Sequence, residues 1–246
     1  MIDIPFDFML KMPRAAKALE DAVRACPTRR ILVVGVEVPG REGDMETVRQ
    51  ILSSNKHVCD YSFVAMKPKG KFDNVNDALE IAGEKLQSAD WLIITEDDIG
   101  ASDKFLDNFI ALIELGGLDL AQPAHRMRSY TSWSLTKRVW RSLVRRTNYV
   151  EIGPLTAINR RVFDELIPFP SMRWAWGLDA YWAHLAALKN WKLGIVDGTP
   201  IEHLRPVGGI YAREEAEREG DIFLKQNNVT IERKEAFAPG HILVGW

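Results

Sequence analysis

The sequence predicts an α/β protein with a mostly parallel central sheet. Short apolar runs rich in β-branched residues alternate along the chain with segments of helical periodicity. This alternation is typical of a sheet with helices packed against it. The length of 246 residues suits one domain with a single core. We therefore expect one α/β domain.

The individual elements follow from periodicity and from start and stop signals. Asn74 and Ser102 are expected to cap the helices that follow them. The predicted strands cover residues 29–38, 60–66, 89–98, 118–124, 150–158 and 192–197. The predicted helices cover residues 14–26, 45–54, 75–88, 103–115, 160–167 and 177–190.

Composition excludes several classes of protein. The 32 basic and 34 acidic residues give a net charge of −2, which argues against a nucleic-acid partner. Cys26 and Cys59 lack CxxC spacing, so we expect two free thiols and neither a zinc site nor a disulfide framework. The N-terminus is not typical of a signal peptide, and no run of about 18 apolar residues is present. These features favour a cytoplasmic protein, with a peripheral position on the inner face of the membrane as an alternative.

Three consecutive carboxylates follow the predicted strand that contains Trp91. These residues are Glu96, Asp97 and Asp98. Ligands of open α/β sheets bind beyond the carboxyl ends of strands, and carboxylate oxygens are ligands for Mg²⁺ or Mn²⁺. Glu96 and Asp98 are two residues apart and can point to one site on an extended chain. The alternative is a solvated turn in which Asp98 or Ser102 caps the next helix.

Several motifs in this order resemble those of GT-A glycosyltransferases. The apolar strand that ends in EDD resembles the DxD-type motif, with Glu in place of the first Asp. The late IEHLRP motif is similar to the one that carries the histidine of the family's metal site. Further similarity to inverting family 2 enzymes lies in GKFDNVNDAL (70–79), IGPLTAINRRVF (152–163) and WAWGLDAYWAHLAALKNWKLGIVD (174–197).

The resemblance covers about residues 29–206 and implies the GT-A fold, a single Rossmann-like domain with a mostly parallel central sheet. We assign residues 29–224 to this domain, residues 1–28 to an N-terminal helical extension and residues 225–246 to a C-terminal tail. Within the domain, residues 124–150 are expected to form a basic, flexible acceptor loop.

The resemblance also implies roles for individual residues. Asp98 and His203 would bind Mn²⁺ or Mg²⁺, and Glu96 or Asp97 would contact the ribose or a metal-bound water. Asp179, at the start of a predicted helix, would be the general base, which implies inversion at the sugar. Lys71 could pair with a phosphate, and Glu37 ends the first strand where the nucleotide is expected. For both residues a solvated loop charge is the alternative.

The segment between His125 and Tyr149 contains seven basic residues and no acidic residue. Trp133 and Trp140 are interleaved with these cations, and residues 135–146 could form a cationic amphipathic helix. The partners that fit are an anionic carbohydrate acceptor, a lipid-linked acceptor or an anionic membrane surface. A mobile lid with solvated arginines is the alternative.

Taken together, these features predict a metal-dependent glycosyltransferase that takes its sugar from a UDP- or GDP-sugar donor. A sugar nucleotidyltransferase is one alternative, but VEVPGREGD (36–44) matches its glycine-rich loop poorly. A non-catalytic carbohydrate-binding protein of the same fold is the other, and the joint presence of Asp98, Asp179 and His203 argues against it.

Overall fold

The computed structural model of the chain describes residues 3–206, 213–230 and 240–245. The helices are α1 (Ile4–Leu10), α2 (Pro13–Ala25), α3 (Glu42–Ile51), α4 (Lys71–Ala82), α5 (Glu84–Ser88), α6 (Phe105–Leu115), α7 (Phe163–Leu166), α8 (Leu178–Lys189) and α9 (Arg213–Gln226). The strands are β1 (Arg30–Glu37), β2 (Val58–Ala65), β3 (Trp91–Thr95), β4 (Ile99–Gly100), β5 (Leu120–His125), β6 (Ser142–Thr147), β7 (Leu155–Asn159), β8 (Leu193–His203) and β9 (His241–Gly245). Two short 3-10 helices cover Ser134–Thr136 and Arg160–Val162.

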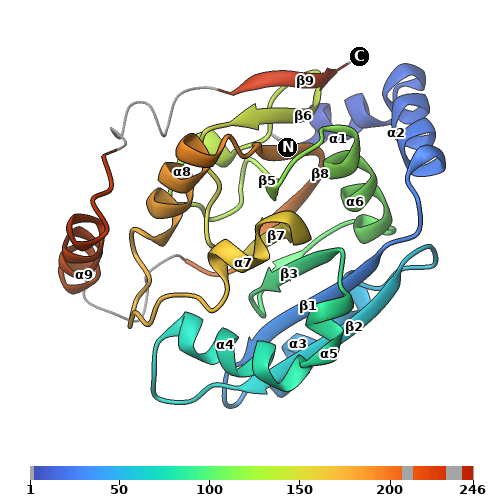
Figure 1. The fold of residues 1–246 in the computed structure, drawn as a ribbon. Helices are drawn as coiled ribbons and strands as arrows, with labels where there is room; N and C mark the ends of the chain where they lie inside the picture. Colours follow the sequence, from blue (N-terminus) through green and yellow to red (C-terminus); the bar gives the residue numbers. More distant parts are fainter. Residues whose placement is uncertain (1–2, 207–212, 231–239, 246) are drawn as a thin grey trace.

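One twisted sheet forms the centre of the molecule (Figure 1). Its strand order is β2-β1-β3-β7-β5-β8-β6-β9, and β4 pairs with β8 outside this path. The pairings give β2, β1, β3, β5 and β8 the same direction, whereas β7 and β6 run antiparallel to their neighbours. The core of the sheet is therefore mostly parallel, as the sequence predicts, and the carboxyl ends of its parallel strands lie along one edge.

Helices cover both faces of the sheet because successive strand side chains point to opposite sides. On β1, Ile31 and Val33 pack in one core with the helices α2, α3 and α6. The neighbouring residues Leu32 and Val34 pack in a second core with α4, α7 and α8. Burial on both faces explains why the strand reads as a continuous apolar run in the sequence.

The chain ends also pack against this domain. The helix α2 contacts α6, and Ala22 of α2 and the following Cys26 are buried in the first core. Near the other end, β9 pairs antiparallel with β6. Part of the predicted tail (225–246), namely residues 231–239 and 246, lies outside the described residues. The domain boundaries at residues 28 and 224 stay predictions.

Both predicted helix caps are wrong. The helix expected from residue 75 begins at Lys71, so Asn74 lies in its first turn. The buried Asn74 amide accepts a hydrogen bond from the Lys67 main-chain N–H at 2.8 Å and donates one to the Gly70 carbonyl at 2.9 Å, which fixes the preceding loop. The helix α6 begins at Phe105 after Lys104 in a left-handed conformation, and Ser102 makes no cap.

The prediction of an amphipathic helix over residues 135–146 is also wrong. Its second half is the strand β6, which lies between β8 and β9. Leu143 and Val144 are both fully buried, and the Arg145 side chain pairs with Asp197 of β8 at 2.8 Å. Because this segment pairs with a strand on each side, its backbone N–H and C=O groups are hydrogen-bonded, and the segment forms a strand instead of a helix.

None of the helices in the described ranges is both long and apolar enough to cross a bilayer.

Candidate active site

The carboxylates after β3 come together with His203 through the pairing of β4 with β8. In this pairing Ile99 lies opposite His203. The Leu204 main-chain N–H donates a hydrogen bond to the Asp98 carbonyl at 2.9 Å. Residues more than 100 positions apart in the sequence thus become neighbours at the carboxyl edge of the sheet, where ligands of such sheets bind.

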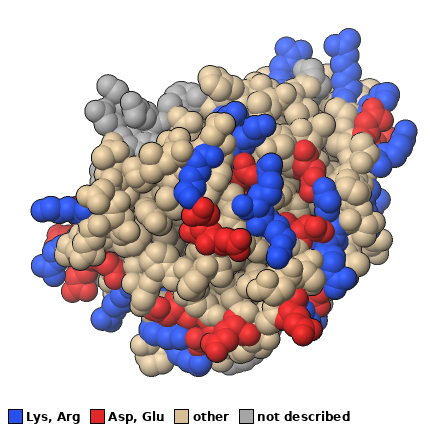
Figure 2. Space-filling view, viewed as in Figure 1, with Lys and Arg blue, Asp and Glu red and all other residues tan. Residues whose placement is uncertain are grey.

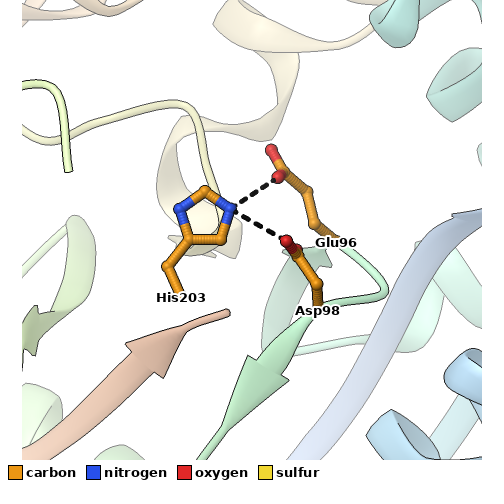
Figure 3. Close-up of side chains that lie close together, drawn as sticks. All are labelled: Glu96, Asp98 and His203. Carbon is orange, nitrogen blue, oxygen red and sulfur yellow. Dashed lines mark ion pairs between the residues drawn. The ribbon is translucent and has the colours of Figure 1, made fainter. Parts of the chain in front are cut away.

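Glu96, Asp98 and His203 point toward one another (Figure 3). The His203 Nε2 atom lies 3.4 Å from Glu96 Oε2 and 3.3 Å from Asp98 Oδ2. The possible ligand atoms of the three residues all lie within 4.8 Å of one another. Asp98 and His203 are buried, whereas Glu96 is half-buried. This geometry agrees with the expectation that Glu96 and Asp98 face one site, and it adds Glu96 to the possible metal ligands.

The electrostatics of this cluster favour a cation between its carboxylates. Burial lowers the pKa of His203, but hydrogen bonds to Asp98 and Glu96 outweigh this effect and raise the pKa to about 9. Burial alone would raise the pKa of Glu96, but the charge of Lys71 and the bond to His203 hold it far below its usual range. A protonated imidazole and the Lys71 ammonium group therefore together balance the charge of the two carboxylates.

The donor set fits a divalent cation. The Asp98 Oδ1 atom is buried and makes no hydrogen bond, although a carboxylate oxygen away from water needs a partner. Two carboxylates with one imidazole suit Mn²⁺, and carboxylates with water suit Mg²⁺. A bound metal ion would take the place of the proton on His203, because a ligating imidazole is neutral.

Asp97 turns away from this cluster. Its Oδ1 atom pairs with the Arg205 guanidinium at 2.8 Å, and Arg205 also pairs with Asp44. Burial raises the pKa of Asp97 despite the opposing charge of Arg205. The second acid of the EDD motif thus belongs to a separate ion-pair group on the same loop.

Lys71, the first residue of α4, reaches the opposite side of the Glu96 carboxylate. Its ammonium group bonds Glu96 Oε1 and lies 3.3 Å from the Ile152 carbonyl. The pair packs directly over Gly153. A Cβ atom at Gly153 would lie 2.2 Å from Glu96 Oε1 and 2.8 Å from Lys71 Nζ, so a side chain at this position would displace the pair.

Asp179 lies in the first turn of α8, as predicted. Its Oδ2 atom accepts a hydrogen bond from the Tyr149 hydroxyl, and its Oδ1 atom accepts one from the Ala180 main-chain N–H at 2.8 Å. Burial raises the pKa of Asp179 to about 6 against these two hydrogen bonds. A carboxylate with this pKa is ionised at neutral pH and more basic than an ordinary aspartate, which suits a general base.

A buried polar network lies next to the backbone of His203. The Glu151 carboxylate lies 3.1 Å from His125 Nε2, and His125 Nδ1 lies 2.9 Å from Ser129 Oγ. The Ser129 hydroxyl accepts a hydrogen bond from the His203 main-chain N–H at 2.7 Å. Tyr149, which bonds Asp179, is two residues before Glu151. These side chains are fixed by internal bonds, and the network positions the backbone of His203.

The sequence patterns predict no role for His125, Ser129, Tyr149 and Glu151. The available signal was that Glu151 is the first acidic residue after the basic segment, and that His125 directly follows the predicted strand 118–124. His125 and Ser129 are only four positions apart, but the other partners lie 26 to 74 positions away in the sequence, so spacing alone does not pair them.

Glu37 lies at the carboxyl end of β1, on the same edge as the cluster. Gly35, two residues earlier, is in register with Thr95 of β3. Within the described part of the chain, the Glu37 side chain makes no hydrogen bond or ion pair. It is therefore available to a ligand, and its role in nucleotide binding stays a prediction.

Three of the seven basic residues of the basic segment form ion pairs inside the molecule. Arg126 and Arg138 both pair with Asp7 of α1, and Arg145 pairs with Asp197. On the face shown in Figure 2, basic and acidic side chains are interspersed. A count of charges along the segment therefore overstates the positive field that it presents to solvent.

Comparison with known proteins supports the fold assignment. No protein-family model matches the sequence, and no curated protein sequence matches it. Structural similarity extends to the mannosyltransferase PcManGT from Pyrobaculum calidifontis in complex with GDP-Man and Mn²⁺, with a TM-score of 0.53 and 14% identity over 89% of this chain and 73% of that one. S. aureus TarS 1-349 in complex with UDP-GlcNAc has a TM-score of 0.53 and 13% identity over 82% of this chain and 68% of that one.

GalNAc-T7 with UDP, GalNAc and Mn²⁺ is similar to the same extent, with a TM-score of 0.53 and 13% identity over 80% of this chain. This chain spans about half of the GalNAc-T7 structure, since the match covers 48% of it. Similarity at this level of identity establishes the architecture, which is the one that the sequence motifs imply. The chain adopts the GT-A fold.

Proposed function

We propose that this protein is a metal-dependent glycosyltransferase that transfers a sugar from a nucleoside-diphosphate donor to an acceptor hydroxyl. The observation that carries the proposal is the convergence of Glu96, Asp98 and His203 at the carboxyl edge of a GT-A sheet (Figure 3). The structural neighbours with GDP-Man or UDP and Mn²⁺ support the same chemistry.

Glu96, Asp98 and His203 would hold Mn²⁺ or Mg²⁺. A divalent cation bound there supplies Lewis-acid stabilisation of the negative charge that develops on the leaving diphosphate. Lys71 adds a fixed positive charge beside Glu96, and it would pair with a donor phosphate. Asp97 and Glu37 lie on the same edge of the sheet and would complete the donor site.

Asp179 would remove the proton from the acceptor hydroxyl. Its raised pKa strengthens it as a base, and the Tyr149 hydroxyl fixes the orientation of the carboxylate. A base that activates the acceptor for direct attack on the anomeric carbon leads to inversion at the sugar. The acceptor would be a carbohydrate or a lipid-linked sugar, with residues 124–150 beside it.

The donor proposal is tested by calorimetric titration of UDP and GDP with Mn²⁺ and, separately, with chelator. We expect at least roughly tenfold tighter binding of one nucleotide with metal present, because a divalent cation held by these carboxylates would attract the phosphates. Asp98→Asn should remove this difference. The matched control is Asp103→Asn, an exposed acid in the same region of the chain, which should leave it intact.

Equal nucleotide affinity with and without metal would refute the metal role. If binding is metal-dependent, incubation with the matching sugar nucleotide and chromatography of the products then tests transfer. Formation of a sugar nucleotide from sugar phosphate and nucleoside triphosphate would instead identify a nucleotidyltransferase and refute the proposal.

A further inference from the structure

The outward side of the N-terminal helix α1 consists of apolar side chains in water. Ile4 and Phe8 are 63% and 70% exposed and lie one helical turn apart, on the same face. Met12, in the turn before α2, is 45% exposed. Side chains of this size are costly to expose next to one another, and such a patch is typical of an interaction site.

Two further exposed residues border this helix. Trp140 is half exposed, and it adjoins α1 because the ring of Phe6 packs edge-on against it at 5.4 Å. Met127 is also exposed, and its main-chain N–H donates a hydrogen bond to Asp3 at the start of α1. We call the surface formed by Ile4, Phe8, Met12, Met127 and Trp140 the α1 surface.

The acidic residues of α1 do not contribute negative charge to this surface. Asp7 pairs with Arg126 at 2.8 Å and with Arg138 at 2.7 Å, and these bonds hold the pKa of Asp7 below its usual value although burial opposes the shift. Asp3 bonds the Met127 N–H and lies 3.4 Å from Arg138. Both carboxylates are thus neutralised from within the molecule.

The basic residues around the α1 surface, in contrast, face solvent. Lys11, Arg14, Arg128 and Arg141 are exposed, and in the part of the chain that the structure describes none of them forms an ion pair. Mainly Lys and Arg side chains project at the upper right of Figure 2, where Figure 1 places α2 and the neighbouring α1. Protruding apolar side chains surrounded by free cations complement an anionic lipid surface.

We propose that the α1 surface docks this protein on an anionic lipid bilayer, with Ile4, Phe8 and Trp140 entering the interface. Tryptophan favours the headgroup level, and long basic side chains favour anionic headgroups. A second copy of the chain is a poor occupant. A two-fold contact would place the same cations against each other without acids to neutralise them.

The docking surface is connected to the candidate active site by a short segment. Ser129, two residues after Met127, accepts the hydrogen bond from the His203 main-chain N–H. Docking requires neither metal nor nucleotide and does not depend on sugar transfer. Its test therefore gives a result whether or not the proposed function holds.

The experiment is flotation of the full chain with vesicles of phosphatidylcholine alone and of equal parts phosphatidylcholine and phosphatidylserine, without nucleotide or metal. Wild type should float with the mixed vesicles only. Lys11→Gln with Arg14→Gln should weaken binding about 25-fold, since each cation near an anionic surface contributes about fivefold. Ile4→Gln with Phe8→Gln should abolish flotation.

The matched control for the apolar pair is Ile81→Gln with Leu188→Gln, because these residues are 73% and 69% exposed on other helices. This control should float like wild type. Equal flotation of the Ile4 and Phe8 variant and the wild type would overturn the proposal, as would absence of wild-type binding to the mixed vesicles. A concentration-dependent dimer in sedimentation velocity that the Ile4 and Phe8 variant abolishes would also overturn it, in favour of a second copy.

Discussion

Replacement of Asp179 by Asn should make the protein more stable and less active at the same time. The carboxylate is ionised at neutral pH although burial opposes its charge, and its pKa of about 6 records this cost. Asparagine keeps the shape and an oxygen that accepts the Tyr149 hydroxyl bond, but it carries no charge. Turnover should fall roughly 10²–10⁴-fold, as is usual for loss of a general base.

The magnitude of the stability gain follows from the pKa. A shift from 3.8 in the unfolded chain to about 6 in the folded one costs up to about 3 kcal/mol when the group is ionised. The pKa of Asp179 is higher in the folded chain than in the unfolded one. The contribution of Asp179 to the free energy of unfolding is therefore fully present below about pH 4 and is lost as pH rises through about 6. Between about pH 5 and pH 8 the wild type should lose about 1.4 kcal/mol relative to the variant.

Urea unfolding of wild type and Asp179→Asn across this pH range measures the difference. Asp164→Asn is the matched control, since Asp164 is an exposed acid in the first turn of α7 and should give no pH-dependent difference. A stability difference between wild type and Asp179→Asn that does not change with pH would refute the reasoning. Unchanged turnover of Asp179→Asn would refute the role as base.

Three further substitutions test residues that stabilise the candidate site and the strand β6. Gly153→Ala and Ser129→Ala should each weaken metal-dependent nucleotide binding in calorimetry by about 10–100-fold, a typical effect of disturbing residues behind metal ligands. The first displaces the Glu96 carboxylate, and the second removes the acceptor for the His203 main-chain N–H. Arg145→Met should lower the free energy of unfolding in urea by about 3–5 kcal/mol, because it leaves the Asp197 charge buried and unpaired.

Each of these predictions has a control. Gly43→Ala adds a methyl group where no atom lies within 4 Å, and Ser132→Ala changes an exposed hydroxyl, so both should bind nucleotide like wild type. Adding Asp197→Asn to Arg145→Met should recover part of the stability, since no buried charge then remains. If the double variant is less stable than the single one, the buried-charge explanation fails.

The sheet could be predicted from the sequence because its strands are buried on both faces. Runs such as Ile31 to Val34 are uniformly apolar, and turns or polar residues interrupt them at the ends. The position of Glu96 and Asp98 at the carboxyl edge of the sheet could be predicted because both residues come directly after an apolar strand. Their proximity to His203 was implied by the family resemblance, and the pairing of Ile99 with His203 accounts for it.

The helix caps and the polar network could not be predicted because their bonds join different elements and loops of the fold. Asparagine is a common N-cap residue, but the Asn74 amide forms hydrogen bonds with a loop up to seven residues earlier in the sequence. The link from Glu151 through His125 to Ser129 depends on how β5, β7 and β8 lie side by side. Helix and strand propensities depend on a residue and its near neighbours, whereas tertiary contacts decide which of the possible local structures forms.

The charge that the basic segment presents to solvent also could not be predicted from the sequence alone. Seven cations without an acid within residues 125–149 indicate a strong local field, which predicts an external anionic partner, with a lid of solvated arginines as the alternative. In the folded chain, Asp3 and Asp7 arrive from the N-terminus and Asp197 from β8, and they neutralise Arg126, Arg138 and Arg145. The pairing of α1 acids with this segment leaves the apolar side of α1 in solvent beside cations that keep their charge. The surface that fits an anionic partner therefore arises from two segments more than 100 residues apart, and neither segment forms it alone.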